Sequence, residues 1–513
     1  MAAIFTVDFQ ICFICIVMCL FSVIFYSLFL VRKTKVGCDL PPSPPSLPIT
    51  GHLHLLLSLL IHRTLQKLSF KYGPILHLRI FNVPIVLVSS ASIAYEIFRS
   101  QDLNVSTRNL PMTNESSVFF GSSGFITAPY GYYWKYAKKI IVTKLLGPQA
   151  LHRSRCIRAD EVKRFYSNLL DKAMKKETVD IGEEAMKLIN NVICKMLMGR
   201  SCSEENGEAE KVRGLVTESD AFLKKFVLAG IFKKLGVSLF KKELTGYSRR
   251  FDVVLETILV ECEEKVSENH EVTDMVDVLL EAYGNKNAEY NITRNHIKSL
   301  FADIFVAGID TSTHVIQWTM AEIINNPNIL EKLIEEIDSV VGKTSLIQET
   351  DLPNLPYLQA VVKEGLRLHP PTPVLIRTFQ ERCEIKGFDI PEKTTLVLNA
   401  YAIMRDPDFW VDPEEFKPER FVNSSKSGLE EEIREECLKY IPFGCGRRGC
   451  PGSNLAYIFL GTAIGVMVQC FDWRIKGDKV NMNETAGAVT LTMAHPLKCT
   501  PVPRTLTLEL GDL

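Results

Sequence analysis

The residues around Cys450 have the types and spacing needed to hold a thiolate beside a flat ligand. The segment runs from Phe443 and Gly444 to Gly452, and it has further glycines at 446 and 449. Glycine lets a backbone turn tightly and approach a ligand closely. Backbone amides directed at the sulfur, with Arg448 nearby, favour the thiolate, which is a strong electron donor to iron. A glycine-rich turn around a buried free cysteine is the alternative.

An acid followed by a hydroxyl lies in a second segment, far upstream of the cysteine. Asp310 and Thr311 follow Ala307 and Gly308 inside a long helical stretch. Glycine within a helix costs about 1 kcal/mol relative to alanine, so we expect it to leave room for a small molecule beside the helix. A carboxyl group next to a hydroxyl can relay protons through water. Back-bonding of Ser and Thr in a bent core helix is the alternative.

Helix and strand patterns in the rest of the chain must position these groups. Residues 298–326 contain no proline and end before Pro327, which predicts a helix of about 43 Å. A second helix is predicted at 328–341, where apolar residues share one face and Gly342 follows. The predicted fold is mainly α with small β-sheets. The strands are expected at 75–81, 84–88, 383–390 and 395–398.

The N-terminus predicts one transmembrane helix ahead of this fold. Residues 11–31 carry no charge, and a helix over them would span about 32 Å, enough to cross a bilayer core. Arg32, Lys33 and Lys35 follow, so the positive-inside rule places the N-terminus in the lumen and the body in the cytosol. A cleaved signal peptide or a buried core helix is the alternative.

The expected organisation has four parts. Residues 1–10 form a lumenal N-terminus, 11–31 the anchor, 32–51 a basic and proline-rich hinge, and 52–513 one cytosolic catalytic domain. Five prolines between positions 41 and 48 exclude a helix or a central strand there. The hinge is therefore predicted to be a semi-rigid spacer.

The composition excludes several classes of protein. With 46% hydrophobic and 23% charged residues among 513, the chain is neither globally disordered nor collagen-like. Its 59 basic and 60 acidic residues give a net charge of −1, so no overall basic field attracts nucleic acid and we expect no such partner. The fourteen cysteines are scattered without repeated C-x-x-C pairs, which predicts reduced thiols.

The cysteine segment resembles the haem-binding loop of the cytochromes P450, F-x-x-G-x-R-x-C-x-G. Phe443, Gly446, Arg448, Cys450 and Gly452 match its five fixed positions. The resemblance implies that Phe443, Gly444 and Gly452 belong to the haem-binding site. The resemblance implies haem b (iron protoporphyrin IX) as cofactor, with Cys450 as the axial ligand of the iron and Arg448 at a haem propionate. The whole chain is accordingly predicted to adopt the P450 fold after its anchor.

Residues 307–311 resemble the P450 oxygen-activation motif, A/G-G-x-D/E-T. The resemblance implies that Thr311 interacts with oxygen and that Asp310 helps to deliver protons. A P450-fold isomerase or dehydratase typically lacks this acid and threonine, and a non-catalytic haem protein needs neither. Both remain alternatives to a monooxygenase.

Two charged segments resemble the structural network behind the haem of P450s. Glu364 and Arg367 are three residues apart in a predicted helix at 358–368, and alone such a pair contributes only about 0.2–0.5 kcal/mol. Arg420 lies in Pro-Glu-Arg-Phe at 418–421. In the family, the glutamate and both arginines join in a buried network, which implies a role for these three residues in haem retention.

Trp134, Lys138 and Arg377 resemble residues that contact haem propionates in this family. Trp134 and Lys138 match the W-x-x-x-R helix, except that lysine replaces arginine. Lysine keeps the charge and loses the bidentate fork. A solvated basic helix face is the alternative for Lys138, and an ordinary surface arginine is the alternative for Arg377.

Several short segments of the sequence resemble those of plant microsomal P450s of the A type. Ala-Tyr-Ala-Ile-Met-Arg-Asp-Pro at 400–407 is one such phrase. Tyr-Ile-Pro-Phe-Gly at 440–444 and Met-Ala-His-Pro-Leu-Lys at 493–498 resemble the subfamily that includes thalianol desaturase. This resemblance implies a single-pass protein of the endoplasmic reticulum membrane that oxidises a lipophilic specialised metabolite, a triterpenoid, by hydroxylation, desaturation or cleavage. A flavonoid or phenylpropanoid is the alternative substrate.

The expected partners follow from the same resemblance. The sequence contains no flavin or nicotinamide fingerprint, so electrons are expected from NADPH–cytochrome P450 reductase, with NADPH acting only indirectly. The other partners are membrane lipid and a lipophilic small molecule. By family analogy, the substrate pocket is lined by Val118, Phe119, Phe120, Phe305, Val306, Leu375 and Val489.

Overall fold

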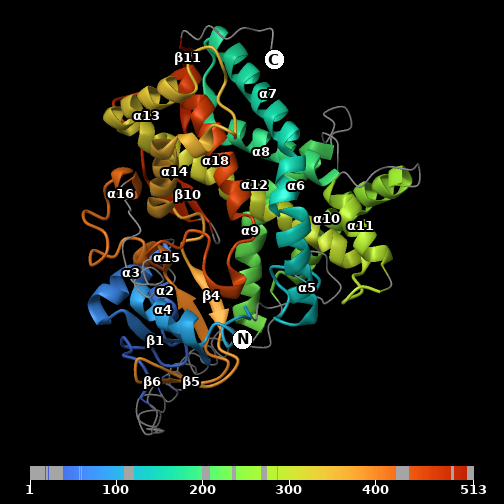
Figure 1. Ribbon diagram of the computed structural model, residues 1–513. Coiled ribbons are helices and arrows are strands. Elements are labelled where there is room, and N and C mark those ends of the chain that lie inside the picture. Colours follow the sequence, from blue (N-terminus) through green and yellow to red (C-terminus); the bar gives the residue numbers. More distant parts are fainter. Residues whose placement is uncertain are drawn as a thin grey trace, which may run out of the picture.

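The computed structural model describes most of the chain (Figure 1). The described residues are Met18, Phe21, 39–56, 58, 60–108, 121–198, 208–233, 239–266, 274–285, 287–422, 438–486 and 490–504. The predicted anchor at 11–31 lies outside them except for Met18 and Phe21. The predicted pocket residues Val118, Phe119, Phe120 and Val489 also lie outside them.

Helices make up most of the described chain. The α-helices are α2 (Leu53–Leu56), α3 (Ile61–Tyr72), α4 (Ala91–Ser100), α5 (Tyr132–Ile140), α6 (Pro148–Arg153), α7 (Arg155–Met174), α8 (Ile181–Met198), α9 (Glu208–Lys233), α10 (Lys241–Val266), α11 (Met275–Gly284), α12 (Arg294–Asn325), α13 (Pro327–Val340), α14 (Pro356–Leu368), α15 (Ala400–Ile403), α16 (Glu419–Val422) and α18 (Ser453–Cys470). A π-helical turn, η2 (Ile141–Leu145), follows α5, and 3₁₀ turns occur at η4 (Leu352–Asn354) and η5 (Gly446–Arg448).

The described residues also form four small sheets. Their strands are β1 (Ile75–Ile80), β2 (Val83–Val88), β3 (Val179–Asp180), β4 (Leu375–Thr378), β5 (Cys383–Ile385), β6 (Phe388–Ile390), β7 (Thr395–Leu398), β8 (Phe471–Arg474), β9 (Glu484–Ala486), β10 (Leu491–Met493) and β11 (Lys498–Pro503). The largest sheet has the order β1-β2-β7-β4, in which only β2 and β7 run parallel. The predicted strands and the fold class, mainly α with small β-sheets, are confirmed.

The long helix α12 crosses the helical body (Figure 1). Its start is set by a capping box, in which Thr293 and His296 each accept a backbone N–H of the other. Pro327 follows its last turn and opens α13, as the sequence predicts. The helix packs against α8, α14 and α18. It therefore brings its middle, which carries the acid and the hydroxyl, to the centre of the protein.

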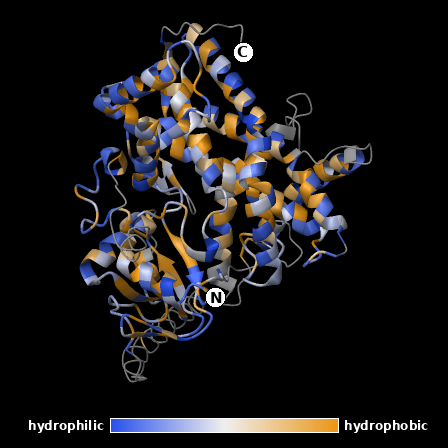
Figure 2. Cartoon of the chain, in the orientation of Figure 1, coloured by the Kyte–Doolittle hydropathy of each residue, from blue (hydrophilic) through white to orange (hydrophobic). Residues whose placement is uncertain are grey.

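Helix α18 belongs to the core. Among the described residues, it alone is long and apolar enough to span a bilayer, but 67% of it is buried inside the protein. Figure 2 shows apolar residues on helix faces that meet other helices and hydrophilic ones along outer faces such as that of α13. Burial of the apolar faces supplies most of the favourable free energy of folding.

The proline-rich segment is attached to the folded body. The His77 N–H donates to Pro42 O at 2.8 Å, and the His52 N–H donates to Arg79 O at 2.7 Å. The His52 ring also contacts Pro44 O at 2.9 Å. These bonds hold the segment along β1, because proline carbonyls accept hydrogen bonds even though proline has no N–H. The described end of the predicted semi-rigid spacer is therefore fixed against the folded body.

Helices α12 and α14 approach each other closely at Gly365. A Cβ built on Gly365 would lie 2.2 Å from Thr319 Oγ1. Thr319 is fully buried and β-branched, so it has little freedom to move away. This contact fixes the position of the helix that carries Glu364 and Arg367.

We expect Gly365→Ala to lower the free energy of unfolding by about 1–3 kcal/mol, the usual cost of overpacking a core. Gly246 lies inside α10 with open space around its Cβ position. Gly246→Ala is therefore the control, and it should be neutral or slightly stabilising. Thermal unfolding followed by circular dichroism checks both variants. Equal melting temperatures for the two would contradict the close contact.

Candidate active site around Cys450

The cysteine loop is a tight turn held by its own backbone. The Cys450 N–H donates to Phe443 O at 2.9 Å, and the Gly444 N–H donates to Ile441 O at 3.0 Å. Gly444 has φ +71°, in the left-handed region that favours glycine. A Cβ at Gly452 would lie 3.8 Å from Cys450 Sγ. The loop therefore presents the sulfur from a constrained backbone directly before α18.

The Cys450 thiol keeps accessible surface while lying deep among protein atoms. Burial raises the pKa of Cys450, against the opposing effects of the Gly452 N–H bonded to the sulfur and of the Arg108 charge. The sequence predicted a stable thiolate, but the protein groups alone favour the thiol. Coordination to a metal ion deprotonates such a thiol outright.

Three guanidinium groups from separate segments gather near Cys450. Arg448 comes from the cysteine loop, Arg377 from β4 and Arg108 from the segment after α4. Burial and the neighbouring arginines lower the pKa of Arg377 and of Arg448 to about 9. Burial also lowers the pKa of Arg108. Such mutual repulsion is relieved by anionic groups, so the cluster suits a ligand with carboxylates.

Arg448 ties the cysteine loop to the first third of the chain. It donates to Ser106 O at 2.6 Å, Phe125 O at 3.2 Å and Ala128 O at 2.6 Å. Its guanidinium carbon lies 4.4 Å from the centroid of the Trp134 ring. Arg377 is nearly fully buried and donates to Ile376 O at 2.8 Å. It is therefore not an ordinary surface arginine.

Trp134 and Lys138 share the inner face of α5. Trp134 Nε1 is buried and makes no hydrogen bond within the described part of the chain. Lys138 Nζ donates to Arg447 O and lies 5.3 Å from the centroid of the Trp134 ring. Lys138 is thus bound to the outside of the cysteine loop and is not simply a solvated side chain.

One face of α12 stays accessible in the middle of the helix. Ala307 is exposed, and Asp303 and Thr311, one turn away on either side, are half-buried. Arg108 interacts electrostatically with both Asp303 and Cys450, so one arginine lies near both the helix face and the cysteine. Thr311 Oγ1 donates to Ala307 O at 2.6 Å. Asp310 lies beside them, with Oδ1 3.5 Å from His314 Nε2.

Two expectations for α12 are wrong. A Cβ at Gly308 would lie 2.8 Å from Ile193 Cδ1, so the missing side chain of Gly308 faces α8 and does not leave room for a ligand. Phe305, predicted to line the pocket, is 1% exposed and packs in the core with Ile309. Residues four apart share a helix face, so Phe305 belongs to the buried face opposite Ala307.

The other described pocket residues differ in position. Val306 is buried in the same core. Leu375 is half-buried at the start of β4, 3.7 Å from where a Gly444 Cβ would lie. Leu375 therefore packs beside the cysteine loop, close enough to contact a ligand held there.

Glu364, Arg367 and Arg420 form one buried network. Arg367 donates to both oxygens of Glu364, at 2.7 Å and 2.9 Å, with both side chains 0% exposed. Arg420 Nε donates to Glu364 Oε1 at 3.2 Å. Arg367 also donates to Met404 O and Pro413 O, each at 2.8 Å. The pair that resembled a weak surface contact is thus fully buried, and it links α14 to residues 404–420.

Asp303 and Arg108 were missed by the sequence analysis. Asp303 accepts the Ile126 N–H at 3.1 Å and also the Phe125 N–H. Burial raises the pKa of Asp303 to about 7, although both N–H groups and Arg108 oppose the shift. The spacing of Asp303, Ala307 and Thr311 along one helix face could have revealed the aspartate. No local pattern singled out Arg108.

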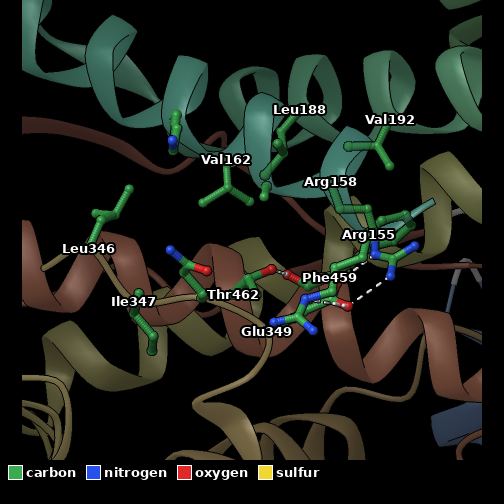
Figure 3. A pocket seen from close by; sticks show the side chains of 13 residues that line it. Arg155, Arg158, Val162, Leu188, Val192, Leu346, Ile347, Glu349, Phe459 and Thr462 are labelled. Atoms are coloured by element: carbon green, nitrogen blue, oxygen red, sulfur yellow. Dashed lines mark hydrogen bonds and ion pairs between the residues drawn. The ribbon is translucent and has the colours of Figure 1, made fainter. Parts of the chain in front are cut away.

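A small cavity lies apart from these groups, between α7, α8, α18 and residues 346–349 (Figure 3). Its volume is about 40 Å³, room for little more than a water molecule. Arg155 and Arg158 point to Glu349 at its edge, and Arg158 makes two bonds at 2.7 and 2.8 Å. None of the predicted site residues lines this cavity.

The described residues around Cys450 fit haem b. Cys450 offers a sulfur ligand for iron, and the glycine-rich backbone allows a flat group to approach closely. Arg108, Arg377 and Arg448 provide the positive charge that two propionates require, and Trp134 Nε1 is a buried donor without a protein partner. When bound, haem supplies one-electron chemistry and oxygen activation.

A cysteine sulfur near buried arginines, together with a central helix that carries an acid and a hydroxyl, is typical of a haem-thiolate monooxygenase. The chain belongs to the cytochrome P450 family, because the model of that family matches residues 41–499. Haem b is the cofactor of this family, and a reductase supplies the electrons for the reaction. A solved zebra fish cytochrome P450 with abiraterone has a TM-score of 0.72 and 23% identity, covering 87% of this chain and 100% of that one.

Plant relatives narrow the assignment. "Cytochrome P450 705A5" of Arabidopsis thaliana is 68% identical over 99% of this chain and 100% of its own length. "Cytochrome P450 705A22" of the same plant is 64% identical over 98% and 99%. "3,9-dihydroxypterocarpan 6A-monooxygenase" of Glycine max is 39% identical over 95% and 98%. The chain is therefore a plant P450 of the 705A subfamily, and the predicted resemblance to that group is confirmed.

We expect Glu364→Gln to destabilise the holoprotein by about 3–5 kcal/mol, because it leaves Arg367 as a buried charge without its counter-ion. The fraction of protein that retains haem and the melting temperature measure the loss. Glu335→Gln, on the exposed face of α13, is the matched control. Retention of haem and of melting temperature in Glu364→Gln would contradict the importance of the network.

We expect Asp303→Asn to remove a pH dependence of stability. Because the pKa of Asp303 is raised in the folded state, the native protein binds a proton between about pH 4 and 7 that the unfolded chain has lost. This contribution to stability is full below about pH 4 and falls as pH rises toward 7. The asparagine variant should therefore gain in melting temperature relative to the native protein between pH 5 and pH 8. If the melting temperatures of Asp303→Asn and of the native protein changed in parallel with pH, the titration of Asp303 would be contradicted. Asp408→Asn, on the surface, is the control.

Proposed function

We propose that this P450 oxidises a triterpenoid by hydroxylation, desaturation or C–C cleavage. The substrate class rests on the resemblance to the subfamily that includes thalianol desaturase. The observation that supports oxygen chemistry is the accessible face of α12, where Thr311 donates to Ala307 O at 2.6 Å. A hydroxyl that donates to a helix carbonyl keeps its lone pairs available to accept a hydrogen bond.

The acid and the arginines have separate roles in this proposal. Asp310 holds a proton one residue from Thr311 and passes it toward the hydroxyl. Cys450 binds the iron, Arg377 and Arg448 hold the propionates with Trp134, and the Glu364 network maintains the fold behind the site. The function of a dehydratase or isomerase is disfavoured, because the acid and the threonine are both present on the accessible face.

A flavonoid is the second candidate substrate. The relative named 3,9-dihydroxypterocarpan 6A-monooxygenase supports it at 39% identity. Leu375 beside the cysteine loop suits either ligand, since it is apolar and small. Identity above 60% to 705A proteins favours the first candidate.

The proposal places the protein in the endoplasmic reticulum membrane through the anchor at 11–31. A single catalytic domain then lies in the cytosol, where NADPH–cytochrome P450 reductase on the same membrane supplies electrons. Fractionation and alkaline extraction of membranes test this location. Release of the full-length chain by alkaline carbonate would contradict a spanning anchor.

We expect dithionite-reduced, carbon monoxide-bound membranes to show a strongly red-shifted Soret band that Cys450→Ser abolishes, because only thiolate ligation gives this shift. Folded protein that binds haem without the band would contradict Cys450 as ligand. The substrate is then sought by incubation with reductase, NADPH and parallel panels of triterpenoids and flavonoids, with products identified by mass spectrometry. Oxidation of flavonoids alone would replace the first candidate with the second.

A further inference from the structure

His314 is a titratable group on the same face of α12 as the acid and the threonine. It lies one turn after Asp310, with Nε2 3.5 Å from Asp310 Oδ1. At about 100° per residue, Ala307, Asp310, Thr311 and His314 fall within roughly 100° of the helix circumference. The His314 and Asp310 side chains are 18% and 14% exposed. Both are therefore partly accessible in the middle of a buried helix.

The second ring nitrogen of His314 has no hydrogen-bond partner among the described residues. This atom, Nδ1, is buried. An unsatisfied buried polar atom costs about 1–3 kcal/mol. His369 Nδ1 is also buried without a hydrogen bond among the described residues, but the His369 ring stacks on Trp318 and bonds to Glu322 at 2.8 Å. The ring contact of His314 is instead with Asp310, at the accessible face of α12.

We propose that His314 is a positioning residue that orients Asp310 and resupplies its proton. The proposal rests on the proposed roles of Asp310 and Thr311. The His314 imidazolium donates its Nε2 proton to Asp310 Oδ1, which leaves a neutral imidazole and a neutral carboxyl group. Asp310 passes the proton toward Thr311, and solvent reprotonates His314. Only protons move, so the step needs no oxidant or reductant.

The separation of 3.5 Å is longer than an ideal hydrogen bond. Hydrogen bonds that serve catalysis are often long before substrate is bound and tighten in the reacting complex. The two residues are four apart on one helix, so a small rotamer change of either brings them together. Thr311 is fixed by its bond to Ala307 O, and the contact with His314 acts on the neighbouring acid.

The experiment uses full-length holoenzyme with reductase and NADPH. His314→Phe keeps ring volume and removes both nitrogens, His314→Gln keeps one donor, and His152→Gln on the exposed part of α6 is the control. The readout is the fraction of NADPH electrons recovered as hydrogen peroxide, which requires no identified substrate. We expect His314→Phe to raise this fraction by about twofold or more. His314→Gln should lie between it and the native enzyme.

A second reaction separates proton delivery from damage to the site. Hydrogen peroxide already carries two protons, so peroxide-driven oxidation of guaiacol should be unchanged in the His314 variants. Equal loss in both reactions, or a peroxide fraction in His314→Phe equal to that of the control, would overturn the proposal. If native enzyme with a normal carbon monoxide spectrum oxidised no NADPH, the proposed function itself would fail.

A double-mutant cycle, measured by melting temperature, tests the contact between His314 and Asp310 without enzyme turnover. His314→Gln, Asp310→Asn and the double variant are melted as holoproteins of equal haem content. Residues in contact give non-additive changes in melting temperature. Additive changes would show that the two side chains do not interact, and the proposal would fall even if peroxide release changed.

Discussion

The arrangement of the site depends on the hydrogen bonds of Arg448. Its guanidinium group donates to the carbonyls of Ser106, Phe125 and Ala128 and stacks on Trp134. One side chain of the cysteine loop thereby fixes two segments from the first third of the chain. Because these acceptors are backbone atoms, the arginine keeps its full charge, which haem propionates can neutralise.

The protein contains two kinds of buried arginine. The charge of Arg367 is compensated, because its guanidinium group donates to the Glu364 carboxylate and to the carbonyl oxygens of Met404 and Pro413. Among the described residues, the hydrogen-bond acceptors of Arg377 and Arg448 are carbonyl oxygens, and the pKa values of both arginines fall to about 9 as a result of burial and mutual repulsion. A compensated buried charge needs no ligand, whereas an uncompensated cluster favours the state in which an anionic cofactor is bound.

Helix α12 serves packing and chemistry on opposite faces. Its glycine at 308 admits Ile193 of α8, and Thr319 meets the glycine at 365 of α14. The remaining face carries Asp303, which accepts N–H groups of the segment that Arg448 also holds. Residues 125–128 are thus bonded both to α12 and to the cysteine loop. This double attachment sets the distance between the acid–threonine pair and the sulfur.

The family, the cysteine loop, the acid–threonine segment and the main helices could be predicted from the sequence, because their signals are local spacing and periodicity. The long helix begins at Arg294, four residues before its predicted start, because a capping box of Thr293 and His296 sets its first turn. Its end before Pro327 follows from a local signal. The tertiary structure sets which side chains meet. It moved Phe305 into the core, assigned Gly308 to a helix crossing and added Arg108, Asp303 and His314 to the site. Such contacts join residues far apart in the chain or depend on which helix face is covered, and a single sequence carries no local signal for either.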